Sequence, residues 1–243
     1  MSEYPSVSGL KPRALLAVET STSVCSVALL KDHQLFEAEE LRPNRHSQVL
    51  LPMIQQLLLE AAIRLPELDG IAVGHGPGSF TGIRIGIAAV QGLAFATGLP
   101  IIAVSSLASL AVQAQFSHVL AILDARMQQL YWGRYCIGHT PDGDLLATLQ
   151  GQEYVSDPEQ VWIPEVTSWI GVGRAWSVYA SRLQGSIARL DKLVEDCRPT
   201  AAATVQLAVS YFKEGRVTRP DHIEPAYLRN EVATKPGSDQ HST

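Results

Sequence analysis

Residues 74–92 read GHGPGSFTGIRIGIAAVQG, and this stretch decides the fold. An apolar run at 71–73 precedes it and predicts a buried strand, whereas the residues from about Thr81 to Thr97 favour a helix. Gly76 and Gly78 allow a tight loop between the two, and such a loop leaves backbone N–H groups unpaired at the start of the helix. A strand, a glycine loop and a helix in this order indicate an α/β fold with a candidate anion site.

The loop does not match the phosphate-binding or nucleophile motifs that it superficially resembles. A P-loop would need a lysine just after Gly82, and a dinucleotide fingerprint would need a glycine at Thr81. A hydrolase nucleophile elbow would need glycines on both sides of Ser79, where Pro77 and Thr81 stand. Generic rules therefore favour a strand-to-helix turn whose glycines serve close packing.

Small residues recur along the helix that follows the loop. Gly78, Gly82 and Gly86 lie four residues apart, and Ala89 continues the same side. Each glycine inside a helix costs about 1 kcal/mol relative to alanine, so the repeat needs a compensating contact. A close helix–helix contact explains it, and that contact is either within the chain or with a partner.

Composition excludes several classes of protein. The chain has 243 residues, of which 46% are hydrophobic and 18% charged, as is typical of a globular protein with one large or two small domains. The net charge of −5 argues against independent high-affinity binding of nucleic acid, which needs a basic surface. Three widely spaced cysteines indicate reduced thiols and a cytoplasmic protein. We expect a flexible leader at 1–13, a disordered tail at 232–243 and no membrane span.

The order of elements in the first part of the chain returns in the second. An apolar run at 14–19 ends in Glu19 and leads through a polar turn into a strand, and a run at 119–124 ends likewise in Asp124. An internal repeat predicts a duplicated α/β architecture, although strands commonly end in an acid at a turn. The predicted lobes are 14–105 and 106–231. An alternative within this division is that the last helix or tail of the second lobe packs on the first. Further predicted elements are strands at 35–41, 101–104, 130–136 and 169–172 and helices at 47–63, 106–115 and 200–214.

Five segments resemble the TsaB (YeaZ) family over residues 15–229. They read LLAVETSTSVCSVALL, HSQVLLPMIQQLL, the block from GHGPGSFTG to AVSSL, LDARMQQLYW and EPAYLR. The resemblance implies the two-lobed actin/Hsp70-like (ASKHA) fold, with ribonuclease H-like lobes. It also implies a noncatalytic partner subunit required for N6-threonylcarbamoyladenosine in tRNAs reading ANN codons. Such a subunit activates or scaffolds a TsaD-like paralogue as a heterodimer, with a TsaE-like ATPase; alone it forms a homodimer, and it meets tRNA only through the complex.

The histidines argue against a catalytic role. The transferase paralogue of this family holds a metal with two histidines in an H-x-x-x-H arrangement, which places both on one face of a helix. No two of the seven histidines here lie within four residues of each other. We therefore assign no catalytic residue and no metal ligand, and the same spacing opposes a third hypothesis, a metallopeptidase.

The resemblance also implies a cleft in which actin-like ATPases bind nucleotide. Those proteins carry an aspartate at the end of the first strand and a glycine-containing turn after it, whereas this chain has Glu19 and a turn without glycine. We interpret the cleft as degenerate and expect no intrinsic cofactor, with ATP or ADP a candidate at a partner interface. A self-sufficient actin-like ATPase or kinase is the alternative. The residues that would line the cleft are Glu19, Thr20, Ser21, Gly76, Gly78 and Ser79.

The resemblance places the partner interface on two helices, at about 47–63 and 81–97. These helices would pair with the equivalent helices of the paralogue. The glycine repeat would then allow two subunits to approach closely, although packing inside the chain explains it as well. The predicted interface residues are Ser47, Leu50, Leu51, Ile54, Gly82, Arg84, Gly86 and Ala89.

Overall fold

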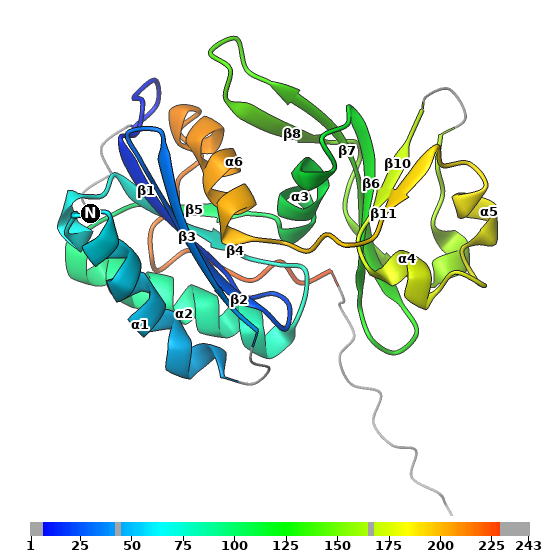
Figure 1. Cartoon of the computed structure of the whole chain (residues 1–243), viewed down its shortest axis with the longest axis horizontal. Helices are drawn as coiled ribbons and strands as arrows, with labels where there is room; N and C mark the ends of the chain where they lie inside the picture. Colours follow the sequence, from blue (N-terminus) through cyan, green and yellow to red (C-terminus); the bar gives the residue numbers. More distant parts are fainter. Residues whose placement is uncertain (1–6, 42–44, 165–167, 229–243) are drawn as a thin grey trace, which may run out of the picture.

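The computed structural model describes residues 7–41, 45–164 and 168–228, which form two α/β lobes side by side (Figure 1). The N-terminal sheet has the strand order β3-β2-β1-β4-β5. β1 pairs antiparallel with β2 and parallel with β4, so a hairpin meander continues into parallel strands. The strands are β1 (Ala14–Glu19), β2 (Cys25–Lys31), β3 (Gln34–Glu40), β4 (Gly70–Gly74) and β5 (Ile101–Val104).

The C-terminal sheet repeats this plan. Its order is β11-β10-β6-β7-β8, with β6 antiparallel to β7 and parallel to β10, and β9 pairs with β7. Read from β8, the sheet has three antiparallel strands (β8, β7 and β6) followed by two parallel strands (β10 and β11). The N-terminal sheet has the same arrangement, which confirms the predicted duplication. The strands are β6 (His118–Asp124), β7 (Leu130–His139), β8 (Leu145–Leu149), β9 (Tyr154–Ser156), β10 (Ile170–Val172) and β11 (Lys192–Val194).

Helices cover both faces of the N-terminal sheet. α1 (His46–Glu60) and α2 (Phe80–Thr97) form the outer layer, whereas α6 (Ala201–Lys213) packs on the opposite face, against β1 and β2 (Figure 1). α3 (Ser106–Ala111) packs on β6 and β7 and meets α6 between the two sheets. All six residues of β1 are buried because its two faces contact different helix layers.

Shorter helices complete the described chain. α4 (Ala175–Val178) and α5 (Gln184–Ile187) lie at the far side of the C-terminal lobe (Figure 1). Their neighbourhood buries Trp132, Trp169 and Trp176 in a separate core. The single-turn 3-10 helices are η1 (Leu65–Glu67), η2 (Val112–Ala114) and η3 (Pro158–Gln160).

Both ends of the described chain pack on the N-terminal lobe. Residues 7–13 belong to the segment expected to be a flexible leader, but Val7 is buried in the central core and the Gly9 amide donates to the Lys213 carbonyl over 2.8 Å. The leader prediction is therefore wrong for these residues. Near the other end, the Thr218 amide donates to the Ile101 carbonyl over 2.8 Å, so the chain returns to the edge strand β5. The tail predicted at 232–243 lies outside the described residues.

Candidate functional site

The turn after β1 and the glycine loop after β4 dock on each other. The Ser79 amide donates to the Ser21 carbonyl over 2.7 Å, and the Thr20 hydroxyl donates to the Gly82 carbonyl over 2.8 Å. A Cβ at Gly78 would lie 2.6 Å from the Ser21 carbonyl oxygen, which leaves no room for a side chain. The structure thus brings together the residues predicted for a nucleotide cleft, and the loop uses its glycine to hold the turn.

Two further loop residues fix this arrangement. Gly76 has a φ of +107°, which favours glycine, and its carbonyl accepts the Ser106 amide over 2.8 Å. The Ser79 hydroxyl accepts the Gly82 amide over 3.3 Å and caps the start of α2. The glycine loop therefore connects β4, the α3 start and the first turn of α2.

Glu19, at the end of β1, is closed off from solvent. Its Oε1 accepts the Ser21 amide over 2.7 Å, and its Oε2 accepts the Ser106 hydroxyl over 2.9 Å. Burial raises the pKa of Glu19, although the hydrogen bonds oppose that shift. A Cβ at Gly74 would lie 1.9 Å from Oε2, so this carboxyl group fills the space beside β4. An acid held in this way ties three segments together and has little room for a metal ion or a phosphate.

A second acid, the half-buried Glu153, is held by Ser105, the residue next to Ser106. Glu153 accepts hydrogen bonds from Ser105 and Tyr135, and burial raises the pKa of this carboxyl group. The adjacent residues Ser105 and Ser106 therefore hold one carboxyl group from each lobe. Glu153 carries no sequence signal of its own, because the loop that places it beside Ser105 has no recognisable pattern.

The structure separates the predicted interface residues into two groups. Gly82 and Gly86 face inward, since a Cβ would lie 2.1 Å from the Thr20 carbonyl oxygen at Gly82 and 2.4 Å from the Thr20 hydroxyl at Gly86. Leu50 and Ile54 are buried in the core between α1 and the sheet. The prediction that these four residues contact a partner is therefore wrong, because all four pack inside their own lobe.

The remaining predicted interface residues are accessible. Ser47, Leu51 and Arg84 are exposed and Ala89 is half-buried. They belong to the outer side of α1 and α2, where Leu51, Leu59 and Phe95 are 51%, 68% and 65% exposed. Ala88 and Gly92 are exposed on the same side of α2, and nothing lies within 4 Å of a Cβ placed on Gly92. We call this surface the α1–α2 face, comprising Ser47, Leu51, Leu59, Ala88, Ala89, Gly92 and Phe95.

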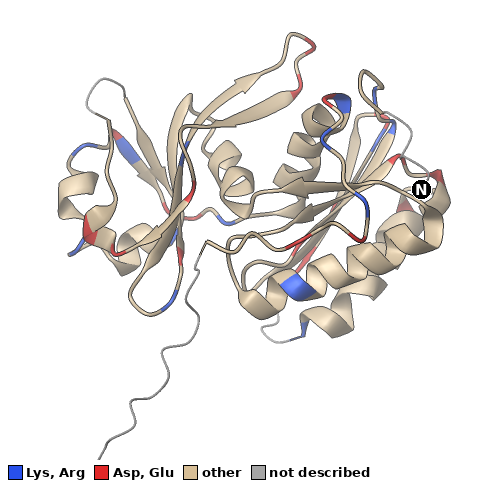
Figure 2. Cartoon of the chain, turned by 180° about the vertical axis from the view of Figure 1, so that it is seen from behind, with Lys and Arg blue, Asp and Glu red and all other residues tan. Residues whose placement is uncertain are grey.

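The α1–α2 face is unusually apolar for exposed helices. α2 has a single charged residue, Arg84, near its start (Figure 2). Among the described residues, α2 is the one helix long and apolar enough by length and composition to cross a membrane, with a mean hydropathy of 1.3 over 18 residues. Its inner side packs on β4 and β1, as in a core helix. On the outer side, apolar side chains such as Phe95 stay exposed in the part of the chain that the structure describes.

Arg84 links the start of α2 to the C-terminal segment. Its guanidinium lies 3.8 Å from the Phe80 ring centroid and donates to the Tyr227 hydroxyl over 2.9 Å. The Ala226 amide also donates to the His75 carbonyl over 2.8 Å. Residues 224–228 of the EPAYLR motif therefore pack against the glycine loop and the start of α2, a contact that spacing along the sequence could not reveal.

The two lobes share the same strand order, and Glu19 at the end of β1 accepts a hydrogen bond from Ser106 between them. These features define an α/β protein of the actin/Hsp70-like class. The family model described as "TsaD: tRNA N6-adenosine threonylcarbamoyltransferase" matches residues 40–236. A tRNA threonylcarbamoyladenosine biosynthesis protein TsaB from Escherichia coli is 36% identical in an alignment 242 residues long, which covers 93% of this chain and 99% of that protein. The Haemophilus influenzae TsaB is 36% identical in an alignment 233 residues long, which covers 91% of this chain and 95% of that protein.

A solved structure agrees with these relatives. YeaZ from Pseudomonas aeruginosa superposes with a TM-score of 0.81 at 40% identity and covers 88% of this chain and 99% of its own. The chain therefore belongs to the TsaB (YeaZ) proteins within the family that this model describes.

Proposed function

We propose that this chain is a noncatalytic partner subunit for forming N6-threonylcarbamoyladenosine in tRNAs that read ANN codons. In this role it activates or scaffolds a TsaD-type transferase, together with a TsaE-type ATPase. The observation that carries the proposal is the uncovered α1–α2 face beside a Glu19 carboxyl group that is buried and fully hydrogen-bonded. The α1–α2 face is suited to binding a partner, whereas the Glu19 carboxyl group is already engaged in hydrogen bonds and is not free to act in catalysis.

The α1–α2 face has the composition of a helix-packing interface. Burying a leucine or phenylalanine side chain contributes about 1.5–3 kcal/mol, and Leu51, Leu59 and Phe95 each present more than half of theirs to solvent. Gly92 and Ala88 have no bulky side chain, so the backbone of a second helix can approach α2 closely at these positions. A TsaD-like paralogue of the same fold would present equivalent helices and form a heterodimer. In isolation a second copy of this chain would take that place as a homodimer.

The proposal assigns the chemistry to the partners. A self-sufficient ATPase or kinase would need an acid at the end of β1 that is free to act on metal-bound phosphate. Glu19 instead holds the Ser21 amide and the Ser106 hydroxyl. We therefore place ATP or ADP at a partner interface, and contact with tRNA in the assembled cytoplasmic complex, because the net charge of −5 disfavours tRNA binding by this chain alone.

Reconstitution tests this function. Purified chain, a TsaD-type transferase, a TsaE-type ATPase and unmodified tRNA are combined, and the modified nucleoside is measured by mass spectrometry. We expect product only when all proteins are present. Product made without this chain, or ATP turnover by this chain alone, would refute the proposal.

A variant pair tests the surface itself. Gly92→Leu fills the open space on the α1–α2 face, and we expect it to abolish co-purification with the transferase while the melting temperature stays near that of the parent. Gly185→Leu is the matched control, because Gly185 also lies in a helix with nothing within 4 Å of its Cβ position, but in the other lobe. Retained binding by Gly92→Leu would remove the α1–α2 face from the proposal.

A further inference from the structure

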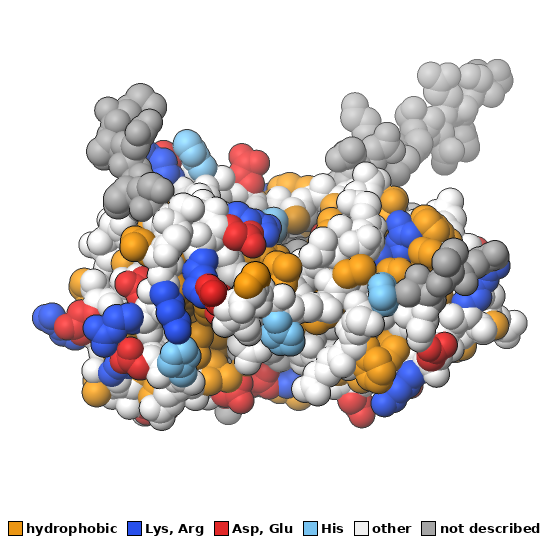
Figure 3. Space-filling model, turned by 90° about the horizontal axis from the view of Figure 1, so that it is seen from above, with side chains coloured by type: hydrophobic (Ala, Val, Ile, Leu, Met, Phe, Trp, Pro, Cys, Tyr) orange, Lys and Arg blue, Asp and Glu red, His pale blue; other side chains and the backbone are white. Residues whose placement is uncertain are grey.

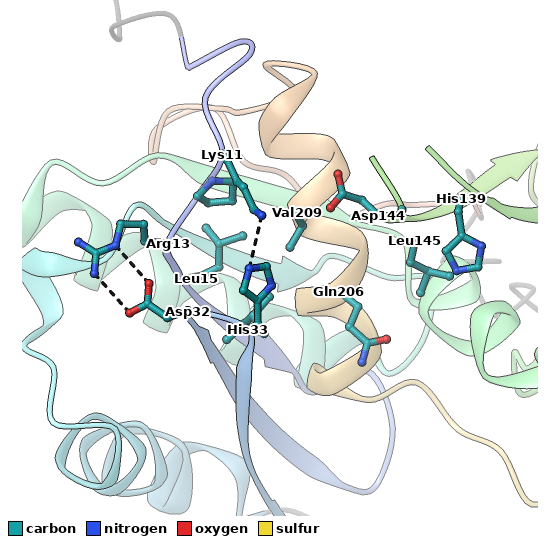
Figure 4. Close-up of a pocket in the computed structure, with 13 residues that line it drawn as sticks. Lys11, Arg13, Leu15, Asp32, His33, His139, Asp144, Leu145, Gln206 and Val209 are labelled. Carbon is teal, nitrogen blue, oxygen red and sulfur yellow. Dashed lines mark hydrogen bonds and ion pairs between the residues drawn. The ribbon is translucent and has the colours of Figure 1, made fainter. Parts of the chain in front are cut away.

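A groove opens between the two lobes at the end of β1 remote from Glu19. Its volume is ≈650 Å³, within the range of roughly 300–1,000 Å³ that small-molecule sites occupy. One wall comes from the N-terminal lobe, at Lys11 and His33, and the other from the β7–β8 hairpin, at His139 and Leu145 (Figure 4). Figure 3 looks onto this side of the molecule and shows hydrophobic side chains with basic and histidine side chains beside them.

The floor of the groove is apolar. Leu15, Leu30 and Val209 line it, from β1, β2 and α6, and Leu145 adds an apolar side chain from the β8 wall. Gln206 lies one turn before Val209 on α6 and offers the groove a side-chain amide that can donate and accept (Figure 4). A ligand here would bury an apolar group and orient it with a few polar contacts.

The acidic side chains of the groove are already neutralised. The Arg13 guanidinium donates to both Asp32 oxygens, over 3.2 and 3.3 Å. Lys213 forms an ion pair with Asp144. Neither carboxylate therefore offers the groove a free negative charge.

Lys11, unlike Arg13, is not neutralised in this way. Lys11 Nζ lies 3.4 Å from His33 Nε2, and in residues 7–41, 45–164 and 168–228 it forms no ion pair with a carboxylate. His139 stands on the opposite wall (Figure 4). One uncompensated ammonium group with imidazoles on both sides suits an anion, since charge-assisted hydrogen bonds to phosphate or carboxylate are the stronger ones.

We propose that this groove binds a small molecule with an anionic end and an apolar body. Lys11 and His33 hold the phosphate or carboxylate end, Leu145 and Val209 cover the body, and His139 stands at the opposite wall. The site goes beyond the proposed function, because it involves neither the Glu19 turn nor the α1–α2 face. Because its walls belong to different lobes, a bound molecule would also connect them.

Methyl NMR titration of the full chain tests the site. The probes are adenosine monophosphate, a phosphate on a nucleoside with an aromatic base, and octanoate, a carboxylate on an alkyl chain. Inorganic phosphate and adenosine are the separate halves of the first probe, and acetate and octanol stand for those of the second. We expect at least one complete probe to shift the methyl signals of Leu145 and Val209 saturably and to bind more tightly than its halves. A response to adenosine monophosphate alone assigns a phosphate ligand, and a response to octanoate alone assigns a carboxylate ligand.

Variants on each wall distinguish this site from others. Lys11→Ala should weaken probe binding about tenfold, the loss expected for one charge-assisted hydrogen bond, and His139→Glu should weaken it from the other lobe. Lys192→Ala is the control, because it removes the same charge at β11, on the other edge of the C-terminal sheet from β8. The inference is overturned if no probe binds at millimolar concentration, if Val18 near the Glu19 turn responds instead, or if Lys11→Ala binds like the parent.

Discussion

Exchanging one glycine at a time for alanine in α2 measures which side of the helix is packed. At Gly82 the new methyl group would lie 2.1 Å from the Thr20 carbonyl oxygen, whereas ordinary contact begins near 3.4 Å. Thr20 cannot easily retreat, because it is fully buried and its hydroxyl is bonded to the Gly82 carbonyl. At Gly92 the same methyl group would meet nothing within 4 Å.

The expected free energies have opposite signs. Overpacking typically costs about 1–3 kcal/mol, and the upper end applies here because the clashing atom is backbone. Alanine returns about 1 kcal/mol of helix propensity, so Gly82→Ala should lose about 2 kcal/mol net. Gly92→Ala keeps the propensity gain and should be stabilised by about 1 kcal/mol, measured at protein concentrations at which the chain is monomeric.

Thermal and urea denaturation of the two variants beside the parent provide the measurement. For a chain of this size about 1 kcal/mol moves Tm by roughly 2–4 °C, so we expect a fall of about 4–8 °C for Gly82→Ala and a rise of about 2–4 °C for Gly92→Ala. If Gly82→Ala melts at or above the parent, the close approach of α2 to the Thr20 turn is not what the glycine serves, and the reasoning fails.

Three further outcomes follow from buried groups. Burial raises the pKa of Glu19 above 4.5, so its contribution to stability is complete below that pH and declines as the pH rises through the folded-state pKa. Glu19→Gln should therefore flatten part of the fall in the urea midpoint as the pH rises above about 4.5, only part because burial shifts the pKa of Glu153 the same way, and an unchanged slope would contradict this. Burial raises the pKa of Cys25 to about 11, so a thiol reagent at mildly alkaline pH should reach Cys25 only after urea unfolds the chain. The Ser210 hydroxyl donates its one proton between the Leu145 carbonyl (3.0 Å) and the Leu207 carbonyl of its own helix (2.9 Å). Ser210→Ala should cost about 1 kcal/mol in urea unfolding, whereas no loss would show that α6 and β8 hold together without this hydroxyl.

The regular elements of the N-terminal lobe could be predicted because their patterns are local. The apolar run at 14–19 and the segment 101–104 coincide with β1 and β5, and the helix expected from Thr81 begins one residue earlier in α2. In the C-terminal lobe the predicted strand at 169–172 shortens to β10, and β11 has no prediction at all. Strands of three residues are too short to show an alternating pattern, and tertiary pairing with a neighbouring strand defines them.

Contacts between distant segments set the limit for the site. The sequence locates Glu19 at a strand end, but its closure depends on Ser106, which is 87 residues away. The Tyr227 contact with Arg84 spans 143 residues. No periodicity encodes such pairs. The residue types alone led to the prediction of a degenerate cleft, which stays a prediction, whereas the hydrogen bonds that hold Glu19 came from the structure.

The glycine repeat shows a different limit. The repeat indicates close packing of α2, but the repeat alone does not tell packing inside the lobe from packing against a partner. An α-helix turns by about 100° per residue, so Gly82 and Gly86 lie on nearly the same side as Ile83, Ile87 and Val90, which are the large apolar residues of α2 that the core buries. A small-residue repeat beside the largest apolar residues of a helix therefore marks close packing inside the lobe.

Gly92 falls on the other side of α2, together with Ala88 and Phe95, where small residues have no large buried neighbour to explain them. Glycine there brings no internal contact, yet it still costs about 1 kcal/mol of helix propensity. No contact in the described chain compensates for this cost. It is recovered only if another molecule packs against the α1–α2 face, and this is the physical reason to seek the partner at Gly92 rather than at Gly82.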